Sequence, residues 1–335
     1  ALPISQNFAV FSLGRQNIYW KIRLGKYMRM WNAEERLFRL NKQVIISGSN
    51  GYLGGRIIKC ILEKTDYSII AVASDIGKIN RMIAREGIDG SRIIPVSSED
   101  LFAGVYSLSN AIGSIHLAFS RRTRPDNDIA NSIDYSWCFF KTLRGACIQN
   151  NVLISSQGVY GETEDFRTEK TAVAPSSPYT MAKYATEILF EEILEKSRRA
   201  IIRLESVIQS QNLVVSLCRQ VKYEGVLRLR GGKQRFSYVD SDDVGTACVA
   251  LLQYSGEWKP IYNVGSSNER YTLVEIAEKV ANIAVKNGFR KPDIKLVEEE
   301  IKLNMGMNCE LFMQDTGWHP QYGIDEMIYR IFLSV

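Results

Sequence analysis

The chain has 335 residues, enough for one large domain or two ordinary ones. Hydrophobic residues make up 45% and charged residues 24%, a composition that excludes disordered and fibrous chains. The net charge is +5, but residues 1–40 hold seven Lys or Arg against two Glu, which leaves 35 of each sign in the rest. The main body is therefore neutral, and we expect no nucleic-acid partner.

The apolar runs, the cysteines and the histidines indicate in which compartment the protein lies and whether it binds a metal. No apolar run approaches the ~18 residues of a membrane span, and the first cation, Arg15, comes after the apolar residues rather than before them, unlike a secretory signal. The six cysteines are scattered and there are only two histidines, His116 and His319. We expect a cytoplasmic protein without a membrane span or a metal site.

Residues 1–42 are predicted to form a basic, amphipathic N-terminal extension. An apolar stripe with helical spacing runs through Trp20, Leu24, Tyr27, Met28 and Trp31. Packing onto the body or onto a second subunit is the first interpretation of this stripe. Association with an acidic membrane surface is the alternative.

From residue 43 onward, short β-branched runs alternate with amphipathic helical stretches. Strands are predicted at 43–47, 68–73, 92–96, 114–117, 152–155 and 200–204. Strict alternation predicts an α/β fold with a doubly wound parallel sheet, the Rossmann fold, over residues 43–205. Residues 206–335 are predicted to form a smaller C-terminal α/β lobe, with some of the chain crossing back to the first domain.

A glycine-rich turn directly follows the first strand and directly precedes a helix. Glycines at 48, 51 and 54 let the backbone turn tightly and approach a pyrophosphate, whose charge meets the free N–H groups of the helix N-terminus. The predicted cofactor contacts in this turn are Gly48, Asn50, Gly51, Tyr52, Leu53 and Gly54.

Asp75 stands at the end of the second strand. An acidic side chain there can accept hydrogen bonds from the ribose hydroxyls of an adenosine and repels a 2′-phosphate, which favours NAD. The alternative is that Asp75 caps the next helix. Lys78 and Arg81 keep NADP open.

A tyrosine and a lysine four residues apart, Tyr179 and Lys183, lie one turn from each other on the same face of a predicted helix. A neighbouring ammonium favours the tyrosinate and lowers the pKa of the phenol. Ser155 and Ser156 end the preceding strand and can place a hydroxyl beside the tyrosine. The pattern predicts a site for proton transfer.

These elements, in this order, resemble the extended short-chain dehydrogenase/reductase superfamily, in particular its nucleotide-sugar epimerase/dehydratase branch. The resemblance covers roughly residues 43–332. Further similar motifs are His116-Leu117-Ala118, Ser177-Pro178-Tyr179, Phe236–Asp240 with Asp243-Val244, Tyr262–Gly265, and Gly317-Trp318-His319-Pro320.

The resemblance implies a role for each matching residue. Tyr179 is the general acid/base, and Lys183 lowers its pKa and binds the nicotinamide ribose. Leu117, Ala118 and Tyr179 itself also contact the cofactor. Ser156 holds the reacting sugar oxygen, and the predicted substrate contacts are Ser156, Gln157 and Arg235.

Two departures from the family pattern narrow these expectations. Family dehydratases carry an Asp-Glu pair where this chain has Gln157 and Gly158, neither of which can do proton chemistry, so dehydration is disfavoured. The family's Arg-Asp-Phe, whose arginine contacts the diphosphate, is here Gln234-Arg235-Phe236. Arg235 either reaches the phosphate from a shifted strand or is a solvated charge.

The predicted function is therefore that of an NAD(P)-dependent nucleotide-sugar epimerase or keto-sugar reductase. The alternatives are a non-catalytic NAD(P)-binding sensor or scaffold, and a reductase of a non-nucleotide carbonyl compound. The resemblance also implies a homodimer that pairs through the helices at about 128–150 and 178–197. Its apolar surface is predicted to come from Phe139, Phe140, Leu143, Ile188 and Leu189.

Overall fold

The computed structural model describes residues 42–120, 123–210 and 212–335. The chain divides into Ala1–Asn41 and Lys42–Val335, and all described residues belong to the second part. The predicted N-terminal extension and its apolar stripe lie outside the described residues.

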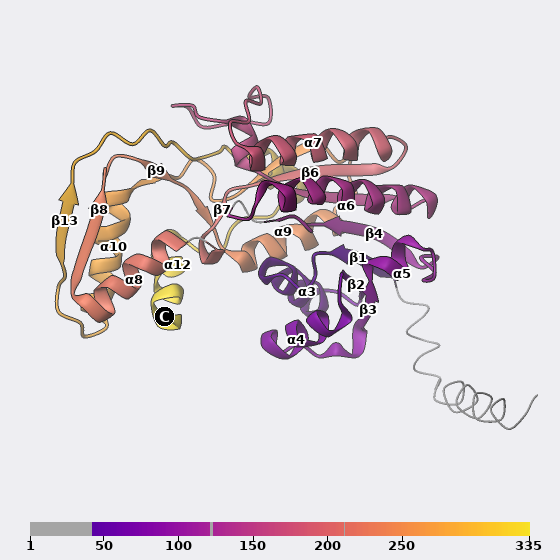
Figure 1. The fold of residues 1–335 in the computed structure, drawn as a ribbon, viewed down its shortest axis with the longest axis horizontal. Coiled ribbons are helices and arrows are strands. Elements are labelled where there is room, and N and C mark those ends of the chain that lie inside the picture. The colour runs from indigo at the N-terminus through magenta and orange to yellow at the C-terminus, as the bar shows by residue number, and fades with distance from the viewer. Residues whose placement is uncertain (1–41, 121–122, 211) are drawn as a thin grey trace, which may run out of the picture. The chain divides into compact units, whose positions relative to one another are not determined.

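A seven-stranded parallel sheet forms the centre of this part of the chain (Figure 1). Its order is β3-β2-β1-β4-β5-β6-β11, so the strand order reverses between β1 and β4, where doubly wound folds bind their ligands. The predicted sheet is confirmed. The strands are β1 (Gln43–Ser47), β2 (Ser68–Ala73), β3 (Ile93–Ser97), β4 (Ala111–His116), β5 (Asn150–Ser156), β6 (Arg198–Leu204) and β11 (Ile261–Val264).

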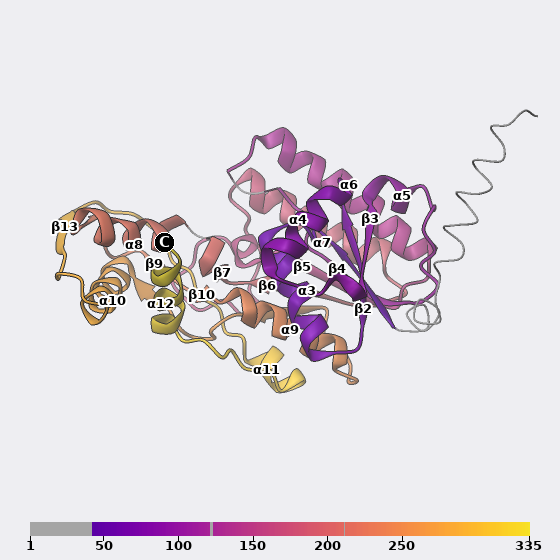
Figure 2. The same cartoon turned by 90° about the horizontal axis from the view of Figure 1, so that it is seen from below.

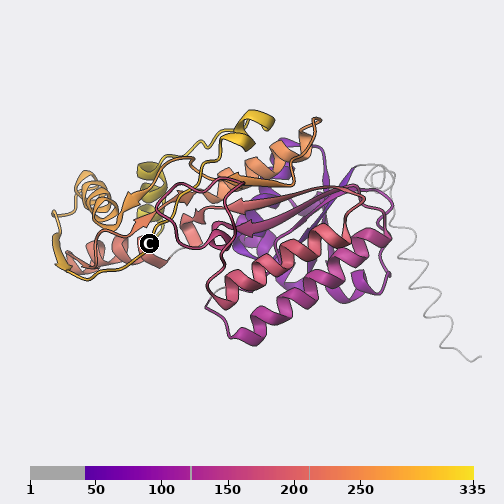
Figure 3. The same cartoon turned by 90° about the horizontal axis from the view of Figure 1, so that it is seen from above.

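Helices cover both faces of the sheet (Figures 1 and 3). Neighbouring residues of β1 bury on opposite faces, Ile45 with one core and Val44 and Ile46 with the other, as expected where side chains alternate. On the Ile45 face lie α5 (Ser98–Phe102), α6 (Asp126–Gly145) and α7 (Pro178–Ile193). On the other face lie α3 (Tyr52–Lys64), α4 (Ile76–Glu86), α9 (Ser241–Gln253) and α11 (Glu310–Thr316).

The predicted dimer surface is wrong at three of its five positions. Phe139, Phe140 and Leu143 are fully buried in the core between α6, α7 and the sheet. The ring of Phe140 packs edge-on against that of Phe190 of α7, with the centroids 5.2 Å apart. Helical periodicity marks an apolar face but not the surface that it covers, and here the sheet is that surface.

A second hydrophobic core lies between α8 (Asn212–Glu224), α10 (Leu273–Lys286) and α12 (Ile324–Ser334), apart from the sheet (Figure 2). Its strands form pairs: β8 (Val226–Arg230) with β13 (Asp293–Val297), β9 (Arg235–Phe236) with β12 (Tyr271–Thr272), and β7 (Ser206–Val207) with β10 (Tyr238–Val239). Both α9 and β11 cross back to the sheet and its core, while the domain boundary at residue 205 stays a prediction. Short 3₁₀ turns occupy Gly90–Arg92, Gln157–Tyr160 and Ile208–Ser210.

Within the described ranges, no helix combines the length and the apolar character that crossing a membrane requires. Among these same residues, no three His, Cys, Asp or Glu side chains converge in a way that could hold a metal ion.

Candidate active site

The glycine-rich turn after β1 is packed too closely to accept larger residues. Gly48 has φ +72°, and a Cβ there would lie 2.8 Å from the backbone nitrogen of Ala118, beyond the end of β4. A Cβ on Gly54 would lie 2.4 Å from the carbonyl oxygen of Gly48. These two glycines therefore let the turn fold back onto both α3 and the end of β4.

The N-terminus of α3 is open to an anion. Gly51 is its N-cap and has no side chain that could bond the N-terminal N–H groups, and the first turn contains no acidic residue. The free N–H groups and the helix dipole suit a pyrophosphate, and the small residues of the turn let its backbone approach one. The residues present therefore fit a dinucleotide.

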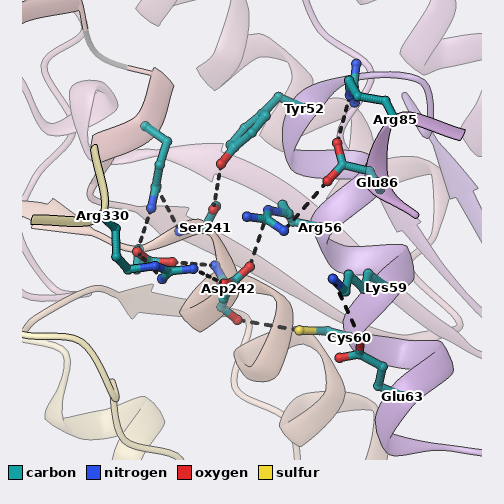
Figure 4. Close-up of polar contacts among 12 residues, drawn as sticks. Tyr52, Arg56, Lys59, Cys60, Glu63, Arg85, Glu86, Ser241, Asp242 and Arg330 are labelled. Carbon is teal, nitrogen blue, oxygen red and sulfur yellow. Dashed lines mark hydrogen bonds and ion pairs between the residues drawn. The ribbon is translucent and has the colours of Figure 1, made fainter. Parts of the chain in front are cut away.

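Other predicted residues of this turn face the protein. Leu53 packs against the core of the sheet, and Asn50 is partly exposed. The hydroxyl of Tyr52 lies 3.3 Å from that of Ser241 at the start of α9 (Figure 4). Arg56, one turn further along α3, forms an ion pair with Asp242 of α9 at 3.4 Å, and Asp242 also pairs with Arg330 of α12. Helix α3 is thus linked to elements of the C-terminal half.

Asp75 caps α4, as the alternative interpretation expected. Its Oδ1 accepts the N–H of Gly77 at 2.8 Å, and its Oδ2 lies 3.6 Å from a guanidinium nitrogen of Arg81. The side chain is 51% exposed, so this ion pair is weak and the capping bond leaves one oxygen accessible. Capping and ribose binding are therefore compatible.

His116, at the end of β4, is a structural residue. Its Nδ1 lies 2.6 Å from the hydroxyl of Ser47 on β1, and its Nε2 lies 2.8 Å from that of Ser136 on α6. Burial lowers its pKa to about 3, and the nearby Lys183 charge acts in the same direction. A neutral ring that joins β1, β4 and α6 fixes the segment that follows, Leu117 and Ala118, against the glycine turn.

The capping box at the start of α7 positions the predicted Tyr–Lys pair. The Ser177 side chain accepts the N–H of Thr180, and the Thr180 side chain accepts the N–H of Ser177, so the helix begins just before Tyr179. Lys183 follows one turn later and is buried. Its ammonium donates to the carbonyl of Ile154 at 3.0 Å.

A residue that the sequence interpretation missed, Phe119, contacts both members of this pair. The ring lies 4.2 Å from the Lys183 ammonium and packs edge-on against Tyr179, with the centroids 5.7 Å apart. Burial lowers the pKa of Lys183 to about 8, although the charge of Glu187 raises it. No local signal marks Phe119, because its importance comes from the packing of the β4 end against α7.

The two serines at the end of β5 have different roles. Ser155 is buried and donates to Glu187, which forms a buried ion pair with Arg203 at 2.6 Å. Ser156 is partly exposed and its hydroxyl accepts the N–H of Gly158 at 3.2 Å. Of the two, Ser156 is therefore the one that can reach a ligand.

Gly158 lets the loop of Ser156 pack against α7. A Cβ on Gly158 would lie 2.9 Å from the methyl group of Thr180, in the first turn of α7. Ser156 thus lies on a loop packed against the helix turn that carries Tyr179. The structure gathers Ser156, Tyr179 and Lys183 around the carboxyl ends of β4 and β5, next to the glycine turn after β1.

The side chain of Gln157, a predicted substrate contact, makes its hydrogen bonds within the protein. It is buried, its Oε1 accepts the N–H of Gly306 at 3.1 Å, and its Nε2 lies 3.5 Å from the hydroxyls of both Ser206 and Ser237. The structure therefore places Gln157 as a link between the Ser156 loop and the C-terminal half.

A buried carboxyl group, that of Glu205, shares this link and was also missed. It accepts the N–H groups of Ser266 at 2.9 Å and Met307 at 3.2 Å. Burial raises its pKa to about 8, against the opposing effect of these hydrogen bonds. Its signal in the sequence is a lone acidic residue between two apolar strands.

Gln234 and Arg235 stand where the family has Arg-Asp, and the first is buried while the second is exposed. Gln234 is buried, with its Nε2 donating to the carbonyl of Arg230 at 2.7 Å and its Oε1 accepting from Gly232, so it closes the turn before β9. Arg235 is exposed on β9. The shift along the sequence thus replaces an arginine with a structural glutamine.

A seven-stranded doubly wound sheet, with a close-packed glycine turn after β1 and a Tyr–Lys pair near the end of β5, defines an α/β protein of the dinucleotide-binding class. Residues 44–265 match the NAD dependent epimerase/dehydratase family, and the chain belongs to that family. The resemblance to extended short-chain dehydrogenases/reductases is confirmed.

Individual relatives are distant. The chain is 24% identical over 257 residues to an uncharacterized protein of Sinorhizobium fredii, covering 73% of this chain but only 61% of that relative. It is 22% identical to ADP-L-glycero-D-manno-heptose-6-epimerase of Cupriavidus pinatubonensis, covering 76% and 82%. A solved structure of UDP-glucose-4-epimerase from Stenotrophomonas maltophila, with bound NAD and formylated UDP-arabinopyranose, superposes with a TM-score of 0.74 at 16% identity, covering 88% and 98%.

Proposed function

We propose that the protein is an NAD-dependent enzyme that epimerises or reduces a sugar linked to a nucleotide. The gathering of Ser156, Tyr179 and Lys183 beside an uncapped helix N-terminus carries this proposal. The solved relative that contains both NAD and a UDP-linked sugar supports the same class of ligands. NADP stays open, because Lys78 and Arg81 follow Asp75.

The cofactor would be held by Gly48, Gly51 and Gly54 at the pyrophosphate, by Asp75 at the adenosine ribose and by Lys183 at the nicotinamide ribose. When bound, NAD supplies a hydride acceptor or donor for a sugar carbon. The protein's own contribution is the binding and orientation of substrate and the movement of a proton.

Tyr179 is the proposed acid/base for the oxygen on the reacting carbon. The Lys183 ammonium, one turn away along the helix, favours the phenolate and so helps Tyr179 to accept a proton. Ser156 orients the same sugar oxygen by hydrogen bonding. Gln157 is tied to Gly306 and has no acidic proton, so water elimination is not part of the proposed reaction.

Tyr179→Phe tests the proposal, in an assay of hydride transfer and epimer formation with NAD and a panel of nucleotide sugars. It should fold and bind NAD normally, while turnover falls about 10²–10⁴-fold, the usual contribution of a positioned acid/base. Tyr184→Phe, on the same helix, is the matched control and should keep full activity. Unchanged turnover of Tyr179→Phe would reject the mechanism, and a wild-type protein that turns over none of the panel would favour a sensor or scaffold.

We propose a homodimer through the outward faces of α6 and α7. Three large apolar side chains are exposed there: Trp137 at 46%, Met181 at 55% and Ile188 at 45%. Light scattering at micromolar concentration should give twice the monomer mass. A monomeric mass would exclude this arrangement.

We also propose a cytoplasmic location. All six cysteines are among the described residues, and all are free thiols, as suits a reducing compartment. Fractionation followed by thiol labelling of the native protein would test it.

A further inference from the structure

Strand β13 is an edge strand with an open outer side. Its one sheet neighbour among the described residues is β8, and the pair lies at the outer end of the second core (Figure 1). The N–H of Asp293 donates to the carbonyl of Gly225, just before β8, at 3.2 Å. Successive residues of a parallel strand direct their N–H and C=O groups to opposite sides, so those of Ile294 and Leu296 point away from β8. No backbone hydrogen bond within the described ranges satisfies them.

The apolar side chains of this edge are only partly covered. In the register of the pair, Ile294 lies beside Leu227. Leu296 lies beside Leu229, and both leucines are buried in the second core. Ile294 and Leu296 continue that core to the edge of the pair, where they are 39% and 45% exposed. The edge therefore offers both the backbone groups and the apolar surface that the addition of another strand requires.

The opposite face of β13 carries two charges without ion-pair partners. Asp293 and Lys295 are exposed, and neither forms an ion pair with another residue that the structure describes. Arg228 of β8 lies directly beside Lys295 and is already paired with Glu224. Lys295 thus has a like charge on one side and an open position on the other, where an acidic residue would be favoured.

We propose that β13 pairs antiparallel with β13 of a second copy of the chain, with the two-fold axis at Ile294. In this register Asp293 of each copy lies directly opposite Lys295 of the other, which gives two cross-strand ion pairs. The two Ile294 residues exchange two hydrogen bonds, because their N–H and C=O groups point outward. The contact is isologous, as two-fold symmetry requires.

Charge selects this register over its neighbours. Hydrogen bonds form only when outward-pointing residues face each other, so the axis must pass through a residue. Registers that pair at least three of the five residues of β13 have their axis at Ile294, Lys295 or Leu296. An axis at Lys295 places this cation opposite its own copy, which is destabilising. An axis at Leu296 places Lys295 opposite Val297 and leaves both charges unmatched.

The same charges explain how an edge that carries a lysine can pair. A lysine on an edge strand usually prevents pairing with another chain. Here Asp293, two residues away on the same face, supplies the matching charge in one register only. The interface is short and therefore weak, so it adds to the dimer proposed through α6 and α7 at concentrations above micromolar.

Sedimentation equilibrium of the full chain over increasing concentration tests the proposal. The mass should rise toward twice its value at micromolar concentration. Lys295→Glu should weaken this association about 10- to 30-fold, because both ion pairs become repulsive. The double variant Asp293→Lys with Lys295→Glu exchanges the two charges and should restore it. Lys170→Glu makes the same change of net charge at an exposed lysine elsewhere and should associate as the wild type does.

Cross-linking tests the register directly. Opposed residues of a hydrogen-bonded pair have Cα atoms about 5.5 Å apart, which suits a disulfide. Mild oxidation with copper phenanthroline should therefore link Ile294→Cys to its own copy. The matched control Leu296→Cys should not be linked, because the two Leu296 positions lie roughly 13 Å or more apart in this register. The wild type, oxidised in the same way, gives the background from the six native cysteines.

Three results would overturn the proposal. The first is a mass that stays constant up to the limit of solubility, which would leave the edge to an extended segment of a different protein. The second is association that Lys295→Glu does not weaken or that the double variant does not restore. The third is a cross-link through Leu296→Cys without one through Ile294→Cys, since it would mean a different register.

Discussion

The Lys183 ammonium lies 4.2 Å from the centroid of the Phe119 ring, and the same ring packs edge-on against Tyr179. One aromatic residue thus contacts both members of the proposed proton-transfer pair. A desolvated cation–π contact is worth about 2 kcal/mol. A ribose hydroxyl that binds Lys183 must therefore share its ammonium with the ring.

Phe119→Leu removes this contact but keeps most of the apolar volume. Because the variant removes one of the contacts of the Lys183 ammonium, NAD should bind about 3- to 10-fold more tightly, as measured by calorimetry. Phe102→Leu, which removes a ring packed edge-on against Tyr135 away from Lys183, controls for general loosening of the core. Weaker NAD binding in Phe119→Leu than in this control would mean that the ring supports the cofactor site.

Gly54→Ala should abolish or greatly weaken NAD binding. Its Cβ would lie 2.4 Å from the Gly48 carbonyl oxygen and 2.9 Å from Cα of Ser49, both backbone atoms that only a shift of the turn can relieve. Gly145→Ala, at the end of α6, meets nothing within 4 Å and should raise stability by about 0.5–1 kcal/mol. Fluorescence titration with NAD and thermal unfolding measure the two effects, and NAD binding by Gly54→Ala at wild-type strength would place the pyrophosphate elsewhere.

Asp75→Asn separates the two roles of this carboxylate. Asparagine caps helices as well as aspartate does and can still accept the N–H of Gly77, so α4 should keep its stability. The loss of negative charge should shift the ratio of NAD to NADP affinity toward NADP by about tenfold, or ~1.4 kcal/mol. Asp89→Asn, at the cap of the turn before β3, is the control. An unchanged ratio would limit Asp75 to capping.

Glu205 should make stability fall as pH rises. Its pKa is about 8 in the folded protein against 4.5 for the free group, so between these values the folded state holds more protons than the unfolded state. The free energy of unfolding therefore decreases across this window, and the contribution of His116, whose pKa is lowered, has the opposite sign.

Urea unfolding of Glu205→Gln and of the wild type from pH 5 to 8 measures how much Glu205 contributes to the pH dependence of the free energy of unfolding. Glutamine stays neutral, but it replaces one acceptor of the Ser266 and Met307 N–H groups, so the variant should be less stable at pH 5. The difference in free energy of unfolding between the wild type and this variant should shrink as pH rises, because only the wild type loses stability. Glu195→Gln, which alters an exposed carboxylate, is the control, and a constant difference between Glu205→Gln and wild type would contradict the prediction.

Much of the fold followed from local pattern. Six of the seven strands of the sheet, the glycine turn and the start of the helix carrying Tyr179 all have signals within a few residues: β-branched runs, small residues after a strand, and Ser-Pro before a helix. The seventh strand, β11, contains most of the Tyr262–Gly265 motif, but its place beside β6 depends on a crossing of the chain.

Which side chains surround the site could be learned only from the tertiary structure. Phe139 and Phe140 had the helical spacing of an interface, yet the sheet covers them, because periodicity does not identify the partner of an apolar face. Phe119 carries no local signal, and Glu205 carries only that of a lone acidic residue, since each acts through a residue far away in the chain: Lys183 and Met307. The sequence alone indicated the glycine turn and the Tyr–Lys pair, because their signals lie within a few residues, whereas only the packing of distant segments decided which charges are buried.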